Sequence, residues 1–220
     1  MEKKRKSFII PLYCFGIIAV FAAVLIIPAA RAWFEGATAE HPFIMGFFKF
    51  AFLALSGELI ALCIKGKRWS LPSYVIARFA LWGLIGVWIT FMMKVFSSGI
   101  GSLIEKNIII GSGSKFLKAL FTSATMNLTF GPTFMAVHKC SDRVLDMIKI
   151  KEKVCIESVI GSINWSEFVR FTLIKTVPLF WIPAHTVTFL LPEAYQVVLA
   201  AFLSVALGII LSFGTKKRAV

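Results

Sequence analysis

Two side chains of opposite charge lie inside long apolar stretches of this sequence. Glu58 falls within FIMGFFKFAFLALSGELIALCI (43–64), and Arg78 falls within the apolar run 73–96. Each lies about five or six residues from the lysine-rich end of its stretch, so a helical rise of about 1.5 Å per residue places them at similar depth. A charge inside a membrane costs about 3 kcal/mol or more unless it is paired or hydrated. We therefore predict a buried ion pair between two adjacent antiparallel helices.

Three lysines, Lys49, Lys94 and Lys118, lie near the opposite ends of apolar stretches. Lysine has a long apolar stem, so its ammonium group can reach the headgroups from a position near a helix end. We expect such snorkelling as the ordinary outcome. The alternative is a basic vestibule on a water-filled path, which would attract anionic solutes.

A polar stripe occurs closer to the C-terminus, in VPLFWIPAHTVTFLLP. Trp181, His185 and Thr188 are spaced by four and three residues, so one helical face carries all three. In a bilayer such a face points to a pore or to other helices. His185 is either a titrating gate or, as is commoner, a histidine bonded to a neighbouring helix. Asn127, in ATMNLTFGPTF, raises the same choice.

The composition is that of a membrane protein. Of 220 residues, 58% are hydrophobic and 16% are charged, whereas soluble domains carry about 25% charged residues. The formal net charge is +13. The lysines and arginines form short clusters between apolar runs, where they indicate topology and contact with anionic headgroups. We therefore expect a lipid bilayer with anionic headgroups as a partner, and no nucleic acid.

Six apolar stretches are long enough to cross a bilayer core of about 30 Å, which takes about 20 helical residues. They are residues 8–30, 43–64, 73–96, 115–138, 171–191 and 194–214. Basic clusters precede the first stretch and follow the second, fourth and sixth, while the opposite loops hold Arg31 and Lys106. The positive-inside rule then places both termini in the cytoplasm. We predict one all-α membrane domain, a polytopic transmembrane helix bundle.

Two parts of this scheme are irregular. Residues 141–171, between the fourth and fifth spans, alternate apolar and charged side chains at near-helical spacing. This pattern predicts an amphipathic helix that lies on the headgroups. In the fifth span, Lys175, Pro178 and Pro183 interrupt the helical pattern, because proline lacks a backbone donor and kinks helices.

Patterns for catalysis or metal binding are not found. The sequence has no GxGxxG, P-loop, HExxH or GxSxG motif. Its cysteines and histidines lack the spacing of a zinc site; they are Cys14, Cys63, Cys140, Cys155, His41, His138 and His185. We expect no cofactor, no metal and no enzymatic activity. A lipid-modifying enzyme with His185 and Glu58 as acid and base is disfavoured, because their expected depths differ by much of the bilayer.

The segment FWIPAHTVTFLLPEAYQV resembles the C-terminal signature of the Mpv/PMP family, W-P-x-x-Q-x-x-N-F followed by V-P-x-x-x-R. HPFIMGFFKFAFLALSGELI is similar to the family's HP and G-D-x-I motifs and places Glu58 at the acidic position. Other matching positions are Gly83, Gly86, Pro132, Trp181, Phe189, Pro192 and Tyr195. The likeness covers about residues 41–214. The chain departs from the signature at Ile182, His185, Thr188 and Gln196, where the family has Pro, Gln, Asn and Arg.

This resemblance implies a helical protein with several spans, of a family thought to form channels or pores for small solutes in mitochondrial inner and peroxisomal membranes. We expect a channel or pore for small metabolites, anionic ones included. Its expected pore or vestibule residues are Lys49, Lys94, Lys118, Asn127, Trp181, His185 and Thr188. The alternative is a non-transporting membrane scaffold or stress-response protein that binds lipids or partners.

The N-terminus lacks transit-peptide character, so we expect a divergent relative in a bacterial inner membrane in preference to a mitochondrial inner membrane. The sequence leaves the oligomeric state open, a homo-oligomer included.

Overall fold

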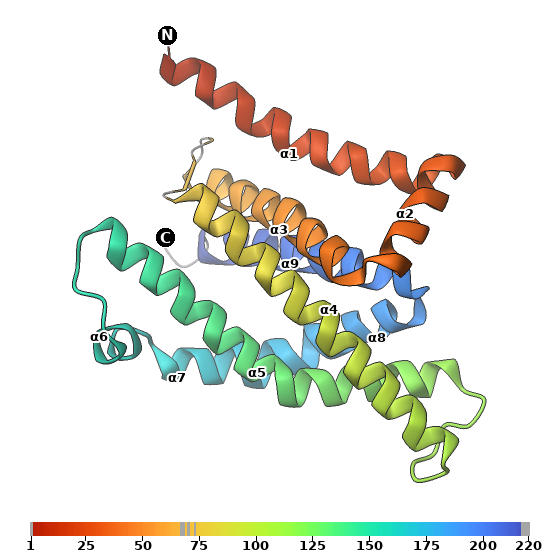
Figure 1. Ribbon diagram of the computed structural model, residues 1–220. Helices are drawn as coiled ribbons and strands as arrows, with labels where there is room; N and C mark the ends of the chain where they lie inside the picture. Colours follow the sequence, from red (N-terminus) through yellow and green to blue (C-terminus); the bar gives the residue numbers. More distant parts are fainter. Residues whose placement is uncertain (1, 67–68, 70, 73, 217–220) are drawn as a thin grey trace. The chain divides into compact units, whose positions relative to one another are not determined.

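A computed structural model describes residues 2–66, 69, 71–72 and 74–216, and all regular secondary structure in these residues is helical (Figure 1). The elements are α1 (Glu2–Ile26), α2 (Pro28–Glu40), α3 (Pro42–Gly66), α4 (Val75–Glu105), α5 (Lys115–Lys149), α6 (Ile156–Gly161), α7 (Trp165–Glu167), η1 (Phe168–Trp181), α8 (Ile182–Leu190) and α9 (Glu193–Lys216). They form two compact units: unit 1 is Met1–Phe91 with Glu193–Val220, and unit 2 is Met92–Pro192. Helix α4 begins in unit 1 and ends in unit 2.

Four stretches are long and apolar enough to cross a membrane: Ile9–Ile26, Pro42–Ile64, Val75–Glu105 and Trp165–Leu190. They correspond to the first, second, third and fifth predicted spans, and they are the helices of a membrane protein. The predicted spans 115–138 and 194–214 fall in α5 and α9. In α9 the apolar part with described side chains, Glu193–Leu207, is shorter than a membrane crossing. In α5, hydroxyl side chains and Asn127 lower the hydropathy.

Unit 1 is built around α3, and α9 packs along it (Figure 1). The contact is close at Gly57, where an added Cβ would lie 2.6 Å from a methyl carbon of Val205. Helix α1 is fastened to α3 by Tyr13, whose hydroxyl donates to the Phe52 carbonyl at 3.4 Å. The thiol of the next residue, Cys14, lies 3.8 Å from the carbonyl oxygen of Ser56, which is one turn beyond Phe52 on α3.

Helices α3 and α4 touch backbone to backbone. A Cβ on Gly86 would lie 2.3 Å from the carbonyl oxygen of Gly46 and 2.6 Å from Cβ of Phe50. A Cβ on Gly46 would meet the hydroxyl of Thr90 at 2.2 Å. Small residues at such a crossing let membrane helices approach closely, and here the two glycines are required by the space available.

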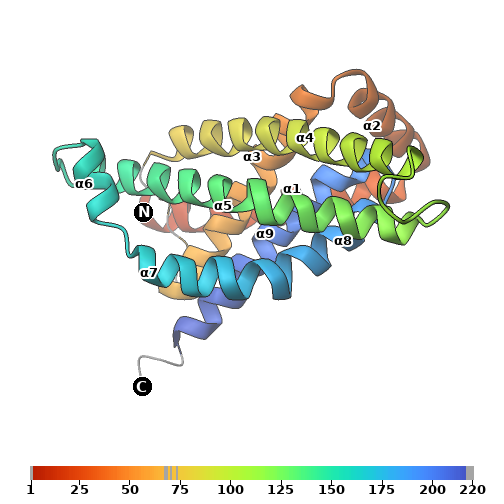
Figure 2. The same ribbon diagram turned by 90° about the horizontal axis from the view of Figure 1, so that it is seen from below.

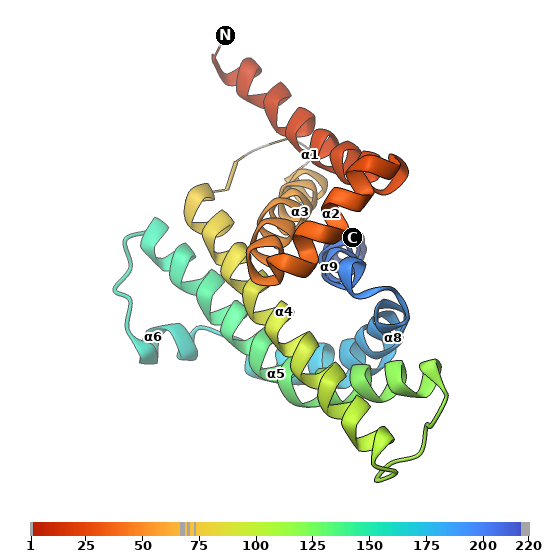
Figure 3. The same ribbon diagram turned by 45° about the vertical axis from the view of Figure 1, so that its right-hand side comes forward.

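The sequence scheme leaves the stretch after the first span as an outer loop, but the structure has a helix there. Helix α2 begins at Pro28, whose missing N–H costs nothing at a helix start. It contacts α1, α3 and α9, and Figure 3 shows it folded back over the end of α3. Its inward face carries Phe34 and Thr38, which are the buried residues of this helix.

Unit 2 is an antiparallel pairing of α5 with η1 and α8 (Figure 2). Helix α5 continues to Lys149, eleven residues past the predicted end of the fourth span. Residues 150–155 are not helical, and the short helices α6 and α7 follow. The prediction of one continuous amphipathic helix over 141–171 is therefore wrong, because the first part of that stretch belongs to α5.

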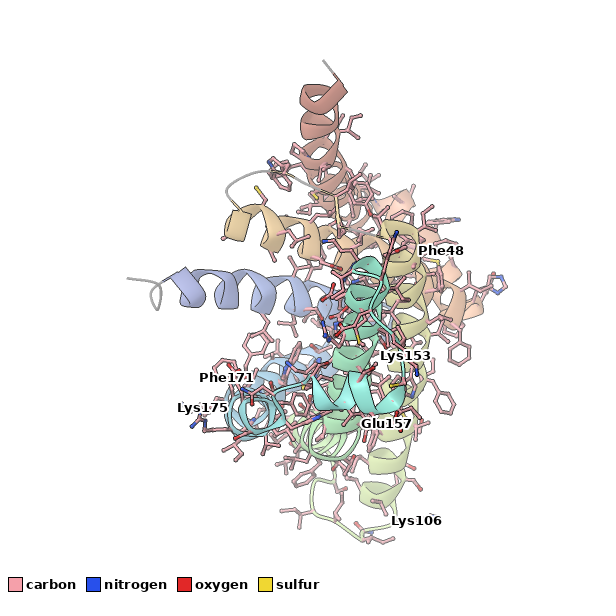
Figure 4. The ribbon with its side chains drawn as sticks, turned by 90° about the vertical axis from the view of Figure 1, so that its left-hand side faces the viewer. Phe48, Lys106, Lys153, Glu157, Phe171 and Lys175 are labelled. Atoms are coloured by element: carbon pink, nitrogen blue, oxygen red, sulfur yellow. The ribbon has the colours of Figure 1, made fainter. Side chains whose placement is uncertain are left out.

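The connecting segment is tied back to α5 by Arg143. Its Nε donates to the Ser162 hydroxyl at 2.7 Å, and its Nη2 donates to Glu152 at 3.1 Å. Figure 4 shows Lys153 and Glu157 on this segment. Hydrogen bonds from its own backbone N–H and from the Cys155 side chain hold the pKa of the Glu157 carboxyl below its ordinary value.

The fifth predicted span is helical up to Leu190, although proline interrupts its sequence. Residues Phe168–Trp181 form a π-helix that contains Pro178, and α8 continues from Ile182 with Pro183 in its first turn. π-helical turns are rare and occur often at functional sites. Lys175 is exposed on η1, on the side where Phe171 also lies (Figure 4).

Candidate functional site in unit 2

Asn127 of α5 and His185 of α8 form the central contact of unit 2. The carboxamide of Asn127 is 3% exposed. Its Nδ2 lies 3.0 Å from Nδ1 of His185, and its Oδ1 lies 3.1 Å from the same ring nitrogen. The donor therefore depends on the histidine tautomer: either the amide N–H₂ donates to Nδ1, or a protonated Nδ1 donates to Oδ1. This bond joins α5 to α8 through two residues that lie 58 positions apart in the chain.

Ser123 extends the polar contact by one turn of α5. Its hydroxyl donates to the carbonyl oxygen of Ile182 at 2.7 Å, and its own carbonyl accepts from Asn127 Nδ2 at 2.9 Å. The same Ile182 carbonyl accepts from the hydroxyl of Thr186 at 2.7 Å. The junction between η1 and α8 is thus held to α5 by the hydroxyl of Ser123.

Trp181 covers the other side of the His185 ring. The two rings stack with centroids 5.1 Å apart and an interplanar angle of 29°. Nε1 of Trp181 is buried, and no described residue accepts a hydrogen bond from it. The indole N–H is therefore a donor inside the protein that is ready for a further acceptor.

Thr188, the third residue of the predicted polar face, is fully buried. Its hydroxyl donates to the Ala184 carbonyl of its own helix at 3.0 Å. The spacing of Trp181, His185 and Thr188 predicts one shared face, and all three are at least partly buried. Only the first two contact each other.

The lysines of unit 2 are not part of the Asn127 and His185 contact. Lys118 is exposed near the start of α5, and a Cβ added to Gly101 would lie 2.9 Å from its Nζ. The end of the Lys118 side chain therefore lies against α4 at Gly101, where the missing side chain of glycine leaves room for it. Lys94 is half-buried on α4.

In unit 1, Lys49 does not snorkel, and that prediction is wrong. Its side chain is 2% exposed. The ammonium donates to the hydroxyl of Thr38 at 2.7 Å and to the carbonyl of Ala194 at 3.1 Å, and it lies 4.2 Å from the centre of the Phe34 ring. Helix α2 supplies the hydroxyl and the ring, so the charge is satisfied within the protein. Lys49 is equally not a residue of an open vestibule.

Phe34 also stacks on Tyr195 of α9, with ring centroids 6.1 Å apart. The Tyr195 hydroxyl donates to the carboxylate of Glu35. These contacts join α2 to α9 beside the Lys49 ammonium. They were missed from the sequence because no local spacing relates residues so far apart in the chain.

The ion pair predicted between Glu58 and Arg78 has the expected geometry. Arg78 Nη1 lies 2.7 Å from Glu58 Oε1, and the two side chains are 12% and 20% exposed, Arg78 first. Trp82 Nε1 donates to the other carboxylate oxygen at 3.1 Å. Trp82 was not identified from the sequence, although it follows Arg78 by four residues and so shares its helical face.

Metal binding has no structural basis in the described residues. No group of three or more His, Cys, Asp or Glu side chains is placed to hold a metal ion there. The four cysteines are free thiols. Glu58 and His185 lie in different units, and each is hydrogen-bonded within its own unit.

Comparison with family models, with curated proteins and with solved structures gives no match for this chain. The resemblance to the Mpv/PMP family therefore stays a prediction.

Proposed function

We propose that this protein is a membrane channel or pore for small metabolites, anionic ones included, and that its polar path runs between α5 and α8. The hydrogen bond between Asn127 and His185 supports this most strongly. Buried polar groups in membrane helices are costly and commonly mark the paths of solutes and ions. An amide, an imidazole and the hydroxyl of Ser123 meet here, and each can exchange its present partner for water or for a solute.

The proposal includes six membrane crossings, with α5 and α9 joining the four apolar stretches. In α5 the polar residues Ser123 and Asn127 are buried, whereas Phe116 and Leu128 are 55% and 61% exposed. A helix with this distribution lies in a bilayer with its polar face against other helices. Together with the basic clusters, this arrangement favours a membrane protein with both termini in the cytoplasm, and a bacterial inner membrane stays the expected location.

Selection for anions would come from Lys94 and Lys118. Both belong to unit 2, and both lie near the end of a predicted span opposite the lysine-rich loops. A positive potential at the mouth of a path raises the local concentration of anions. Lys49 has no part in this selection, because its ammonium is buried and capped in unit 1.

Solute uptake by proteoliposomes tests the proposal. Asn127→Leu keeps the size of the side chain and removes both polar atoms, and we expect it to reduce uptake of lactate and glycerol about tenfold, equivalent to about 1.4 kcal/mol of barrier. Thr129→Val is the matched control, since Thr129 is exposed on α5 and donates to the Thr125 carbonyl of its own helix. Gel filtration confirms that each variant is folded.

Charge selection is tested by Lys94→Gln combined with Lys118→Gln. We expect the ratio of lactate to glycerol uptake to fall while glycerol uptake is unchanged. The pore proposal is contradicted if liposomes that contain the wild-type protein take up lactate and glycerol no faster than protein-free liposomes.

That last result would favour a non-transporting membrane scaffold. The surface segment around the end of α5 supports this second candidate. There, exposed apolar side chains alternate with lysines; they are Ile148, Ile150, Val154 and Ile156, with Lys149, Lys151 and Lys153. Such a surface binds anionic lipids or partner proteins without any transport.

A further inference from the structure

The indole N–H of Trp181 is a buried donor without an acceptor in the described part of the chain. Its Nε1 is inaccessible to solvent, although the rest of the side chain is only partly buried. Nearly all buried N–H groups in folded proteins have a hydrogen-bond partner, because a buried donor that bonds to nothing is costly. An acceptor that is not part of the described chain would satisfy this N–H.

Two aromatic neighbours fix the orientation of this indole. The ring of His185 stacks on it with centroids 5.1 Å apart, and the ring of Phe180 meets it edge to face at the same centroid distance, with an interplanar angle of 82°. His185 is held in turn by its bond to Asn127 on α5. Because the indole is already ordered, little conformational entropy is lost when a ligand accepts from its N–H.

The imidazole of His185 adds a second polar atom to this ring stack. All of its hydrogen bonds to described residues are made by Nδ1. When the Asn127 amide donates to Nδ1, the neutral imidazole carries its proton on Nε2, which is then a donor. In this tautomer the two rings offer N–H groups and no free acceptor, so they suit a ligand that only accepts.

The helices that carry these donors hold no carboxylate of their own near this contact. Residues 115–141 and 168–192, which include most of α5 and all of η1 and α8, contain no Asp or Glu. Hydrogen bonds to an ionised oxygen are about twice as strong as those between neutral groups. An anionic ligand is therefore favoured over a neutral one. The lysines and arginines of the same two ranges are Lys115, Lys118, Lys139, Arg170 and Lys175.

We propose that Trp181 Nε1 donates a hydrogen bond to the carboxylate of a small solute bound beside the contact between Asn127 and His185. This inference rests on the proposed path between α5 and α8, and it names the class of solute that the path binds, a small monocarboxylate. A polyol such as glycerol also has oxygen acceptors, but its bond to the indole is neutral and weaker. Trp181 then determines specificity inside the path, beyond the contribution of Lys94 and Lys118 at its mouth.

Ultraviolet resonance Raman spectroscopy of the purified full-length protein in detergent tests this site without any transport. The frequency of one indole band reports whether the N–H is hydrogen-bonded, and subtracting the spectrum of Trp181→Phe from that of wild type isolates the band of Trp181. We expect sodium lactate to shift this band towards the hydrogen-bonded frequency. A band that lactate leaves unchanged overturns the proposal. An equal shift with glycerol, or with sodium chloride at the same concentration, overturns the assignment of a carboxylate.

Trp181→Phe also separates the donor from the packing of the ring in an uptake assay. Phenylalanine can still stack on His185 but has no N–H. We expect the lactate concentration that gives half-maximal uptake by proteoliposomes to rise about fivefold, which corresponds to the loss of one hydrogen bond. Trp33→Phe is the matched control, because Trp33 is 65% exposed on α2. A lower maximal rate with an unchanged half-saturating concentration overturns the proposal.

A second substitution covers the case in which Trp181→Phe does not fold. The benzothiophene analogue of tryptophan, incorporated at position 181, keeps the size of the indole and has sulfur in place of the N–H. It should give the same rise in the half-saturating lactate concentration and the same loss of the Raman shift.

Failure of this inference and failure of the proposed pore are separate outcomes. The Raman shift requires binding alone, so a shift caused by lactate in a protein that transports no solute would keep the carboxylate site and reject the pore. Lactate uptake with the same half-saturating concentration in wild type and in Trp181→Phe would keep the pore and reject the site.

Discussion

Nζ of Lys49 lies 2.7 Å from Oγ1 of Thr38, so a lysine inside an apolar helix is held by a hydroxyl from the helix before it. The same hydroxyl donates to the Phe34 carbonyl at 2.7 Å, which leaves its lone pairs directed to the ammonium. A buried cation is thus satisfied without a carboxylate from any described residue.

Thr38→Val should destabilise the protein more than Lys49→Met. Valine keeps the shape of threonine but leaves a buried ammonium with one acceptor fewer, and a hydrogen bond to a charged group contributes about 1.5–3 kcal/mol. Methionine removes the charge together with its requirement for acceptors, which is often nearly neutral. Thermal unfolding in detergent, followed by tryptophan fluorescence, measures the difference. A lower melting temperature for Lys49→Met than for Thr38→Val would contradict this account of the site.

Reversal of the ion pair should rescue stability only in part. Glu58→Arg and Arg78→Glu each leave two like charges close together, and breaking a buried pair costs about 3–5 kcal/mol, a range reduced here because both side chains are partly exposed. The double variant restores opposite charges. It also places a guanidinium opposite Trp82 Nε1, which now donates to Glu58, so one donor loses its acceptor.

Adding Trp82→Phe to the double variant removes that unsatisfied donor. We expect the triple variant to be more stable than the double variant, whereas Trp82→Phe in the wild-type background should destabilise. The four melting temperatures form a thermodynamic cycle, and equal effects of Trp82→Phe in both backgrounds would show that the indole is not coupled to the carboxylate.

Gly86→Ala should destabilise the contact between α3 and α4. The new methyl group would lie 2.3 Å from a backbone oxygen of Gly46, and a backbone atom cannot move aside as the end of a side chain can. Overpacking of this kind costs about 1–3 kcal/mol. Gly99→Ala in the same helix is the control, because nothing lies within 4 Å of its added Cβ. There the better helix propensity of alanine should stabilise by up to about 1 kcal/mol.

Arg143→Gln should release the segment between α5 and α7. The substitution removes the bonds to Ser162 and Glu152. Because exposed ion pairs contribute about 0.2–1 kcal/mol, we expect trypsin cleavage at the lysines of this segment to accelerate about twofold to fivefold. Lys139→Gln, an exposed change on the same helix, should leave the cleavage rate unchanged.

The helical fold follows from features that are local in the sequence. The lengths of the apolar stretches predict α3 and the core of α4, and residue depth relates Glu58 to Arg78. The spacing of four residues predicts that Trp181 and His185 share a helical face, and the structure adds that their rings stack. Each of these depends on one helix or on two neighbours joined by a short loop.

The remaining features depend on contacts between distant residues. Asn127 and His185 were each singled out, but nothing in the sequence relates two positions 58 residues apart. The prediction that Lys49 snorkels was wrong because α2 was taken for a loop. This helix carries Thr38, whose hydroxyl accepts a hydrogen bond from the Lys49 ammonium. Pro28 at its first turn was the available signal.

The polar residues of α5 affect both its hydropathy and its packing. Ser123 and Asn127 lower the hydropathy of α5, and the same residues form its hydrogen bonds with α8. When a helix uses polar side chains to contact neighbouring helices, its mean hydropathy falls, and composition alone identifies it less clearly as a membrane span. The π-helical form of η1 has no comparable signature, since Pro178 predicts a kink and not a wider helix.

The crossing of α3 and α4 at Gly46 and Gly86 also offers a structural criterion for identifying homologues. Hydrophobic positions in membrane helices drift easily among leucine, isoleucine and phenylalanine, so soft motifs fade as sequences diverge. A position where a carbonyl oxygen contacts a glycine does not tolerate such substitution, because every larger residue would force the two helices apart. Distant homologues with this architecture should therefore keep two glycines forty positions apart at this helix crossing, even where other sequence motifs are not conserved.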